Sequence, residues 1–134
     1  MNFLGVFVAG ILASVAVEQP QVLPGVLDFP VLRGATLSAD CGGMRDVVGP
    51  ELTCVSAPMQ RINDLVFGYA AEAETRGWRD FGGAANAKWM VRETAQGCER
   101  LTIAAFWDFR RHPEPRDGIP GFVGFQVEKI SRCA

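Results

Sequence analysis

The residues best suited to chemistry lie in one short stretch near the C-terminal end of the chain, RRHPEPRDG. It holds the only histidine of the sequence, His112, and surrounds it with charged side chains, namely Arg111, Glu114, Arg116 and Asp117. A histidine beside a carboxylate can act as a general acid or base, and arginines can bind a carboxylate. The prolines of the stretch are nevertheless typical of a stiff, solvated loop, and a loop tip seldom has the cleft that catalysis needs. We therefore interpret this stretch as a candidate binding loop and expect no catalytic residue.

A second group with binding potential is aromatic. Trp78, Phe81 and Trp89 lie close together in the sequence, with arginines beside them. They form a candidate aromatic patch, although tryptophans are more commonly packed in a core. No glycine pair has the pattern of a phosphate-binding loop, and no serine stands in a nucleophile elbow. The sequence thus predicts no cofactor.

The chain contains four cysteines: Cys41, Cys54, Cys98 and Cys133. They show no CxxC spacing and are accompanied by a single histidine, so we expect no metal site. In a small chain behind a signal-like segment, an even number of cysteines is typical of disulfides. Three pairings are possible. We favour Cys41–Cys54, which closes a local loop, and Cys98–Cys133, which closes the ends of a hairpin.

The chain begins with an apolar run, residues 1–17, that carries no charged side chain before Glu18. It is short for a membrane span, which needs about 20 residues. Ser14 and Ala16 supply the small side chains that a signal-peptidase site requires. Residues 1–16 are therefore expected to be a cleaved signal peptide, or else an anchor that associates with the membrane. The usual lysine or arginine of a signal peptide is absent, and a buried segment of a cytosolic fold is the third interpretation.

Length and composition indicate one globular domain. The chain has 134 residues, of which 49% are hydrophobic and 21% charged. A net charge of −2 with dispersed arginines offers no positive surface for a nucleic acid, so none is expected as a partner. Residues 17–40 are proline-rich and are expected to form an extended segment, and residues 41–134 a single domain. The extended segment is expected to lay its apolar side chains on the domain surface: Leu27, Phe29 and Val31.

Residues 98–133 have the pattern of an antiparallel hairpin that encloses the His112 loop. Leu101, Ile103 and Trp107 share one face of its first strand, so we expect Trp107 in the core. Two constraints on the register disagree. Pairing the two cysteines places the apolar residues of the strands on opposite faces, whereas a slip by one residue gathers them on one face and separates the cysteines. A β-bulge at Gly121 or Gly124 would satisfy both.

The strongest helix pattern covers residues 56–76, where Ser56 can cap the start and Gly77 follows the end. Residues 84–96 fit a helix or a strand equally well, and both stay open. The remaining segments are expected to be a short strand at 35–40, an irregular loop at 41–54 and a turn at 77–83. The sum is an α+β fold: a small antiparallel sheet, built on a disulfide-stapled C-terminal hairpin and packed by one or two helices.

One order of landmarks resembles a known family. Two cysteines, an amphipathic helix, Lys88-Trp89 and Cys98 follow one another as in the LprI-type lysozyme-inhibitor domain. The resemblance covers at most residues 41–98 and implies a secreted protein with a helical core. The strand-like run from Leu101 and the long interval between Trp89 and Cys98 depart from that pattern, so we do not assign the chain to the family.

These observations lead to an expected function. The chain is expected to be an exported or membrane-tethered accessory protein of the cell envelope, not an enzyme, that binds another protein or an envelope component. Its expected location is periplasmic or secreted. Two alternatives are a small periplasmic enzyme that uses the His112 loop and a secreted protein similar to lysozyme inhibitors.

Overall fold

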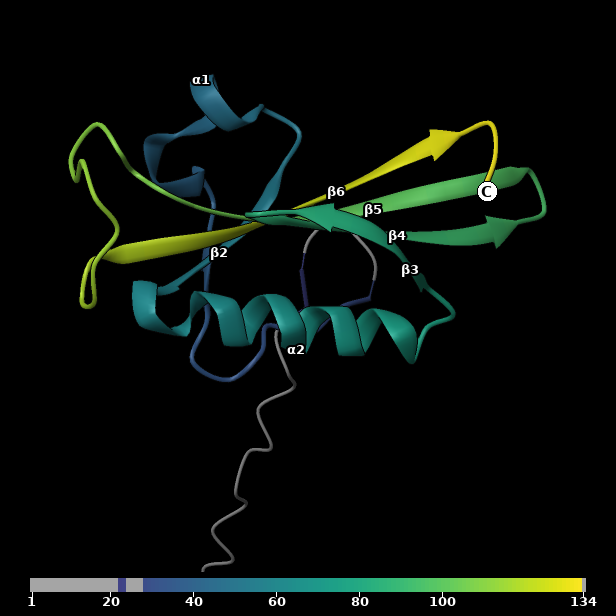
Figure 1. The fold of residues 1–134 in the computed structure, drawn as a ribbon, viewed down its shortest axis with the longest axis horizontal. Coiled ribbons are helices and arrows are strands. Elements are labelled where there is room, and N and C mark those ends of the chain that lie inside the picture. Colours follow the sequence, from purple (N-terminus) through teal and green to yellow (C-terminus); the bar gives the residue numbers. More distant parts are fainter. Residues whose placement is uncertain (1–21, 24–27, 134) are drawn as a thin grey trace, which may run out of the picture.

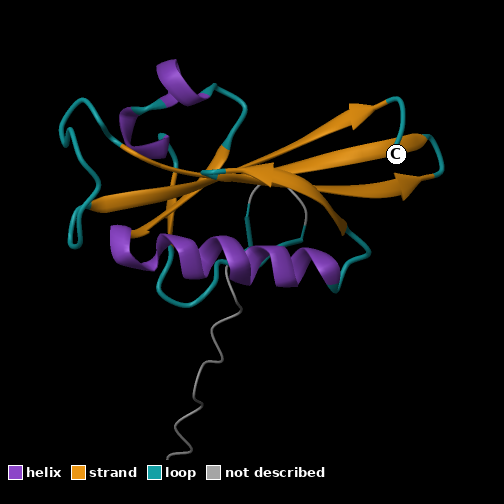
Figure 2. Ribbon diagram, viewed as in Figure 1, coloured by secondary structure: helices purple, strands orange, loops and turns teal. Residues whose placement is uncertain are grey.

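The computed structural model describes residues 22–23 and 28–133. The expected signal peptide or anchor at 1–16, and Leu27, lie outside these residues. The described chain is mostly sheet with one substantial helix packed along it (Figure 2). No helix within these residues combines the length and the apolar character that crossing a bilayer requires.

The centre of the fold is a six-stranded antiparallel sheet with the strand order β1-β2-β6-β5-β4-β3 (Figure 1). The hairpin expected at the C-terminal end supplies its two longest strands, which occupy the middle of the sheet. The strands are β1 (Thr36–Ser38), β2 (Thr53–Pro58), β3 (Arg79–Ala84), β4 (Ala87–Thr94), β5 (Gly97–Trp107) and β6 (Pro120–Ile130).

One face of the sheet is covered by helix α2 (Ile62–Glu74), which follows a single 3-10 turn, η2 (Met59–Arg61). Its buried side chains recur every three or four residues and pack on the sheet. Gly121 of β6 permits the close approach at the start of α2, because a Cβ at that position would collide with the side chain of Ile62. The opposite face carries two short helices at one end, η1 (Cys41–Gly43) and α1 (Arg45–Val48).

The helix begins later than the sequence pattern predicts. Residues 56–58 belong to strand β2, whose Val55 and Ala57 point into the core opposite Val123 and Gly121 of β6. Pairing with a central strand satisfies the backbone groups of this segment and outweighs the capping potential of Ser56. The expected start of the helix was therefore wrong by six residues.

The open question at residues 84–96 is resolved in favour of a strand, β4. Met90 is buried beneath α2, while its neighbour Val91 is buried on the opposite face beside the Cys98–Cys133 disulfide. Because this part of the sheet is covered on both faces, the strand lacks the alternation of polar and apolar residues that marks a half-buried strand. The expected turn at 77–83 is also wrong in part, since residues 79–84 form the edge strand β3.

The register of the β5–β6 hairpin meets both constraints in a way the sequence did not indicate. Ile103 pairs with Phe125, so the apolar residues of both strands face α2, and Cys98 pairs with Ile130. Residues 131–133 then turn back and bring Cys133 to Cys98, and the second disulfide joins Cys41 to Cys54. No bulge interrupts β6 at Gly121 or Gly124. The irregularity in register lies in β3 instead, between Asp80 and Gly82.

The segment before β1 is packed more deeply than we expected. Phe29, expected to pack onto the domain surface, is instead fully buried within the core, with the centre of its ring 6.3 Å from that of Tyr69 and 6.5 Å from that of Phe125. Leu23 is buried in the same cluster. We call residues 28–32 the N-terminal arm; it lies against α2 and completes the core.

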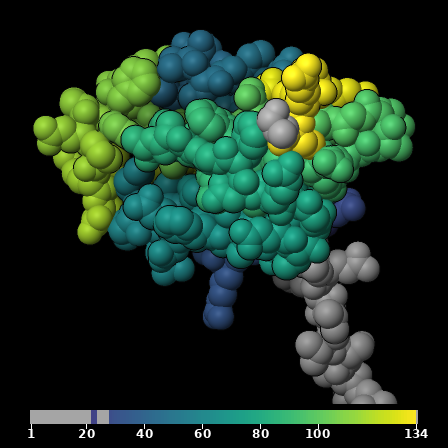
Figure 3. Space-filling model, turned by 45° about the vertical axis from the view of Figure 1, so that its right-hand side comes forward, coloured from purple at the N-terminus to yellow at the C-terminus, as the bar shows by residue number. Residues whose placement is uncertain are grey.

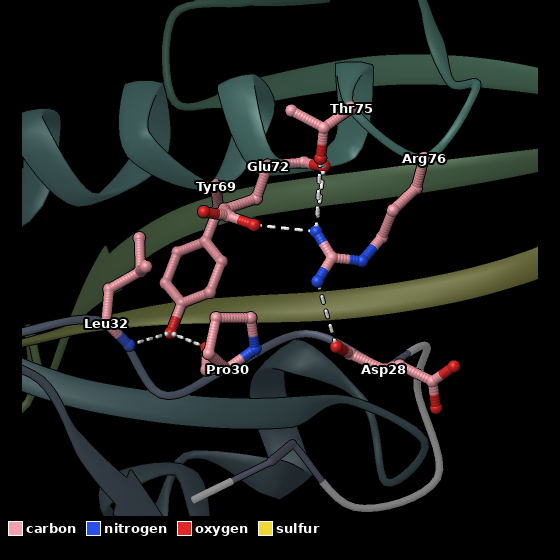
Figure 4. A network of polar contacts seen from close by, with 7 residues as sticks. All are labelled: Asp28, Pro30, Leu32, Tyr69, Glu72, Thr75 and Arg76. Carbon is pink, nitrogen blue, oxygen red and sulfur yellow. Dashed lines mark hydrogen bonds and ion pairs between the residues drawn. The ribbon is translucent and has the colours of Figure 1, made fainter. Parts of the chain in front are cut away.

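Polar contacts from α2 fix the arm in place (Figure 4). The Tyr69 hydroxyl accepts a hydrogen bond from the Leu32 N–H and donates one to the Pro30 carbonyl, both at 3.0 Å. The Arg76 guanidinium donates to the Asp28 carbonyl at 3.1 Å and pairs with Glu72 at 2.6 Å. Burial raises the pKa of the Tyr69 hydroxyl, which is consistent with its internal position. The arm is therefore held by side chains as well as by apolar packing.

This packing predicts unequal costs for two phenylalanine truncations. Phe29→Ala should lower the free energy of unfolding by about 3–5 kcal/mol, because it removes a buried ring from the core. Phe67→Ala, at a position on α2 where 69% of the residue is exposed, should change it by less than about 0.5 kcal/mol. Urea denaturation followed by tryptophan fluorescence measures both values. Similar small effects at the two positions would show that the arm is not part of the core.

Candidate functional site

The His112 loop joins β5 to β6 and protrudes at one end of the molecule (Figure 3). Asp108 organises its first turn. The carboxylate of Asp108 accepts hydrogen bonds from the backbone N–H groups of Arg110 and Arg111, and its carbonyl accepts from the N–H of His112 at 2.9 Å. This is the local bonding that makes Asp common at the start of turns.

Both ends of the loop are tied to the body of the protein. Arg110 pairs with Asp46 of α1 at 2.8 Å and donates to the carbonyl of Gly43. At the other end, the Gly118 N–H donates to the Gln60 side chain at 2.8 Å. Arg110, the first residue of the candidate stretch, is therefore the arginine that anchors the loop. The proximity of α1 that gives it this role has no local signal in the sequence.

The structure does not gather the candidate residues of the loop into a site. His112 is half-buried, but it is its backbone carbonyl that is engaged, accepting from Trp107 Nε1 at 2.8 Å. Within the described residues, neither Glu114 nor Asp117 forms an ion pair or hydrogen bond with the His112 imidazole. The other charged candidates of the loop, Arg111, Glu114, Arg116 and Asp117, are exposed.

The three aromatic candidates lie in different places. Trp78 is buried on the α2 side of the sheet, where the Arg92 guanidinium lies 4.5 Å from the centre of its ring. Trp89 is half-buried on the other face, opposite Thr102 in the register. Phe81 is exposed on the edge strand β3. These side chains therefore do not form one aromatic patch.

A groove that no local sequence pattern indicates lies between the first half of α2 and the β3–β4 hairpin. Its volume is about 450 Å³. It is lined by Met59, Ile62, Asn63, Val66, Phe67, Asp80, residues 82–88, Ala105 and Trp107. Trp107, expected in the core, is half-buried and lines this groove, while its indole N–H holds the His112 loop. The groove exists because its sheet side is built from glycine and alanine, which leave space beside the helix.

The groove is mainly apolar and carries one ion pair at its edge. Lys88 Nζ lies 2.8 Å from the Asp80 carboxylate, which also accepts from the Gly82 N–H at 3.0 Å. The hydrogen bond from Lys88, followed by that from Gly82, lowers the pKa of Asp80, so this carboxylate is ionised across the neutral range. Because the two charges of the lining neutralise each other, the groove presents an apolar and uncharged interior.

No group of histidine, cysteine or acidic side chains in the described part of the chain is arranged to hold a metal ion.

No protein-family model, no curated protein and no solved structure matches the chain. The resemblance to the LprI-type domain thus gains no support, and the six-stranded sheet departs from the helical core that it implied.

The loop geometry predicts a small effect for the histidine. His112→Ala should change the free energy of unfolding by less than about 0.5 kcal/mol, because the contact from Trp107 goes to the backbone. Thermal unfolding of the variant beside the parent protein measures this. Asp108→Ala is the matched comparison: it removes the carboxylate that accepts from two backbone N–H groups and should destabilise the loop more. A larger loss for His112→Ala than for Asp108→Ala would contradict this assignment.

Proposed function

We propose that this protein is an exported or membrane-tethered binding protein of the cell envelope, without enzymatic activity, that acts through contacts with another protein. The single observation that carries the proposal is the pair of disulfides, Cys41–Cys54 and Cys98–Cys133. Disulfides persist in oxidising compartments and are rare in the cytosol, so they are consistent with a periplasmic or extracellular location. The apolar start of the sequence agrees with export.

The surface supports the binding half of the proposal. The groove beside α2 is apolar, and Phe67 stands largely exposed at its rim. Exposed apolar patches that accompany a groove are typical of interaction sites. The His112 loop does not contribute its candidate residues to this groove: its charged candidates are exposed, and His112 is not among the residues that line the groove.

Intact-mass analysis of the protein produced in its native host tests the proposed location. The mature protein should begin at Val17 and be lighter than its reduced form by the four hydrogens that two disulfides remove. An Ala16→Phe variant is the control, because a bulky side chain at the cleavage site blocks signal peptidase. That variant should keep its full mass and stay with the membrane.

The two forms of the proposal give different results. A full-length mass with both disulfides in the membrane fraction of the unaltered protein identifies the tethered form. A full-length, reduced protein in the cytosolic fraction would contradict export altogether.

A further inference from the structure

The groove beside α2 has a wall of unusual construction. Residues 82–87 all line it, and they are consecutive in the chain. Gly82, Gly83 and Ala84 are successive residues of β3, and residues 85–86 form the turn to β4. Because successive residues of a strand point to opposite faces, a cavity lined by all three contacts the backbone of the hairpin as well as its side chains. Because residues 82–87 are glycine, alanine and one asparagine, another chain can approach that backbone closely.

The same hairpin supplies a free edge of the sheet. β3 is the last strand in the sheet order, and all six of its residues are exposed. In the part of the chain that the structure describes, no strand pairs with its outer edge. The Asp80 carboxylate accepts a hydrogen bond from the Gly82 N–H at the bulge, so this N–H is not available to another strand. The segment available for pairing therefore begins beyond the bulge, next to the groove. An exposed strand edge of this kind is a template for another extended segment.

The charges of the groove restrict what can enter it. Its lining contains one cation and one anion, Lys88 and Asp80, and they bind each other. A charged occupant would have to break that pair or lose its hydration without compensation. The occupant that fits is uncharged and apolar. An alkyl chain could fill the groove but could not hydrogen-bond to the exposed β3 edge, whereas a peptide with an apolar side chain can do both.

We propose that this face binds an extended segment of a partner protein, which pairs with β3 beyond its bulge and places one uncharged apolar side chain in the groove between β3–β4 and α2. The backbone hydrogen bonds would supply affinity and the groove would supply specificity, as in other cases of strand addition. Phe67 at the rim would cover the inserted side chain. The inference rests on the proposed function, since it names the surface and the partner chemistry for a protein that acts by binding.

A peptide library provides the test. The probe is a set of acetylated, amidated pentapeptides, Thr-X-X-X-Thr, with the three central positions randomised, offered to the full oxidised protein. The parent protein should enrich peptides that share an uncharged apolar residue at one central position. Ala105→Leu, which fills the floor of the groove, should reduce that enrichment at least about tenfold, equivalent to about 1.4 kcal/mol of binding free energy.

Ala104→Leu is the matched control. Ala104 is the half-buried neighbour of Ala105 on β5 and faces the opposite side of the sheet, so this variant should keep the enrichment. If Ala105→Leu fails to unfold cooperatively, Ala84→Phe replaces it, because Ala84 lines the groove and is exposed. The best peptide is then N-methylated at one amide at a time. Methylation of an amide that pairs with β3 should abolish binding, whereas methylation of a neighbouring amide should not.

Each other outcome overturns the inference in a distinguishable way. If the parent protein enriches no peptide, the proposed peptide site is ruled out. If the parent and Ala105→Leu proteins enrich peptides equally, the peptide binds elsewhere. That result is compatible with the proposed binding function but rules out the groove as the binding site. Dodecanoate binding that is sensitive to Ala105→Leu, without peptide enrichment, identifies an acyl-chain site. Groove-dependent dimerisation in sedimentation identifies a second copy as the occupant.

Discussion

The centre of the Tyr69 ring lies 4.6 Å from that of the Phe125 ring, in an edge-on arrangement, and 6.3 Å from that of the Phe29 ring. One side chain of α2 therefore contacts both the central strand β6 and the N-terminal arm. Aromatic rings in this geometry contribute beyond the area that they bury. The Tyr69 hydroxyl adds two hydrogen bonds to the arm, which leaves no buried polar atom of this tyrosine without a partner. Helix, sheet and arm therefore meet at Tyr69, which fixes the position of the helix over the sheet together with the other buried side chains of α2.

The placement of α2 accounts for the asymmetry of the surface. The second half of the helix is occupied by the arm and by Trp78, whereas the first half stands beside small residues of the β3–β4 hairpin. That difference leaves the groove at one end and a filled core at the other. The two disulfides act elsewhere: one fixes η1 to β2 on the opposite face, and the other closes the open end of the β5–β6 hairpin. Neither disulfide includes a residue of β3, although the Arg79 guanidinium at the start of this strand donates a hydrogen bond to the Cys133 carbonyl at 3.0 Å.

Much of the sheet could be predicted from local patterns, and the rest depended on contacts between distant segments. The alternation of residues 101–107 indicated the C-terminal hairpin, and residues 35–40, which lead into Cys41, were expected to be a short strand, which forms as β1. The register of the hairpin stayed open because the turn at 131–133, which brings Cys133 back to Cys98, has no clear sequence signal. β4 was ambiguous because both of its faces are covered. The burial of Phe29 and the groove itself depend on where α2 lies, and no local pattern records that position.

Amide hydrogen exchange of the arm tests the central claim, that residues 28–32 are part of the folded core. The Leu32 N–H donates to the buried Tyr69 hydroxyl, and the Leu23 N–H donates to the Phe29 carbonyl at 2.8 Å. Two-dimensional NMR after transfer to D₂O should show both amides exchanging as slowly as those of β5 and β6, because both open only when the core opens. Exchange of Leu32 at the rate of an unstructured peptide, while β5 and β6 stay protected, would contradict the account.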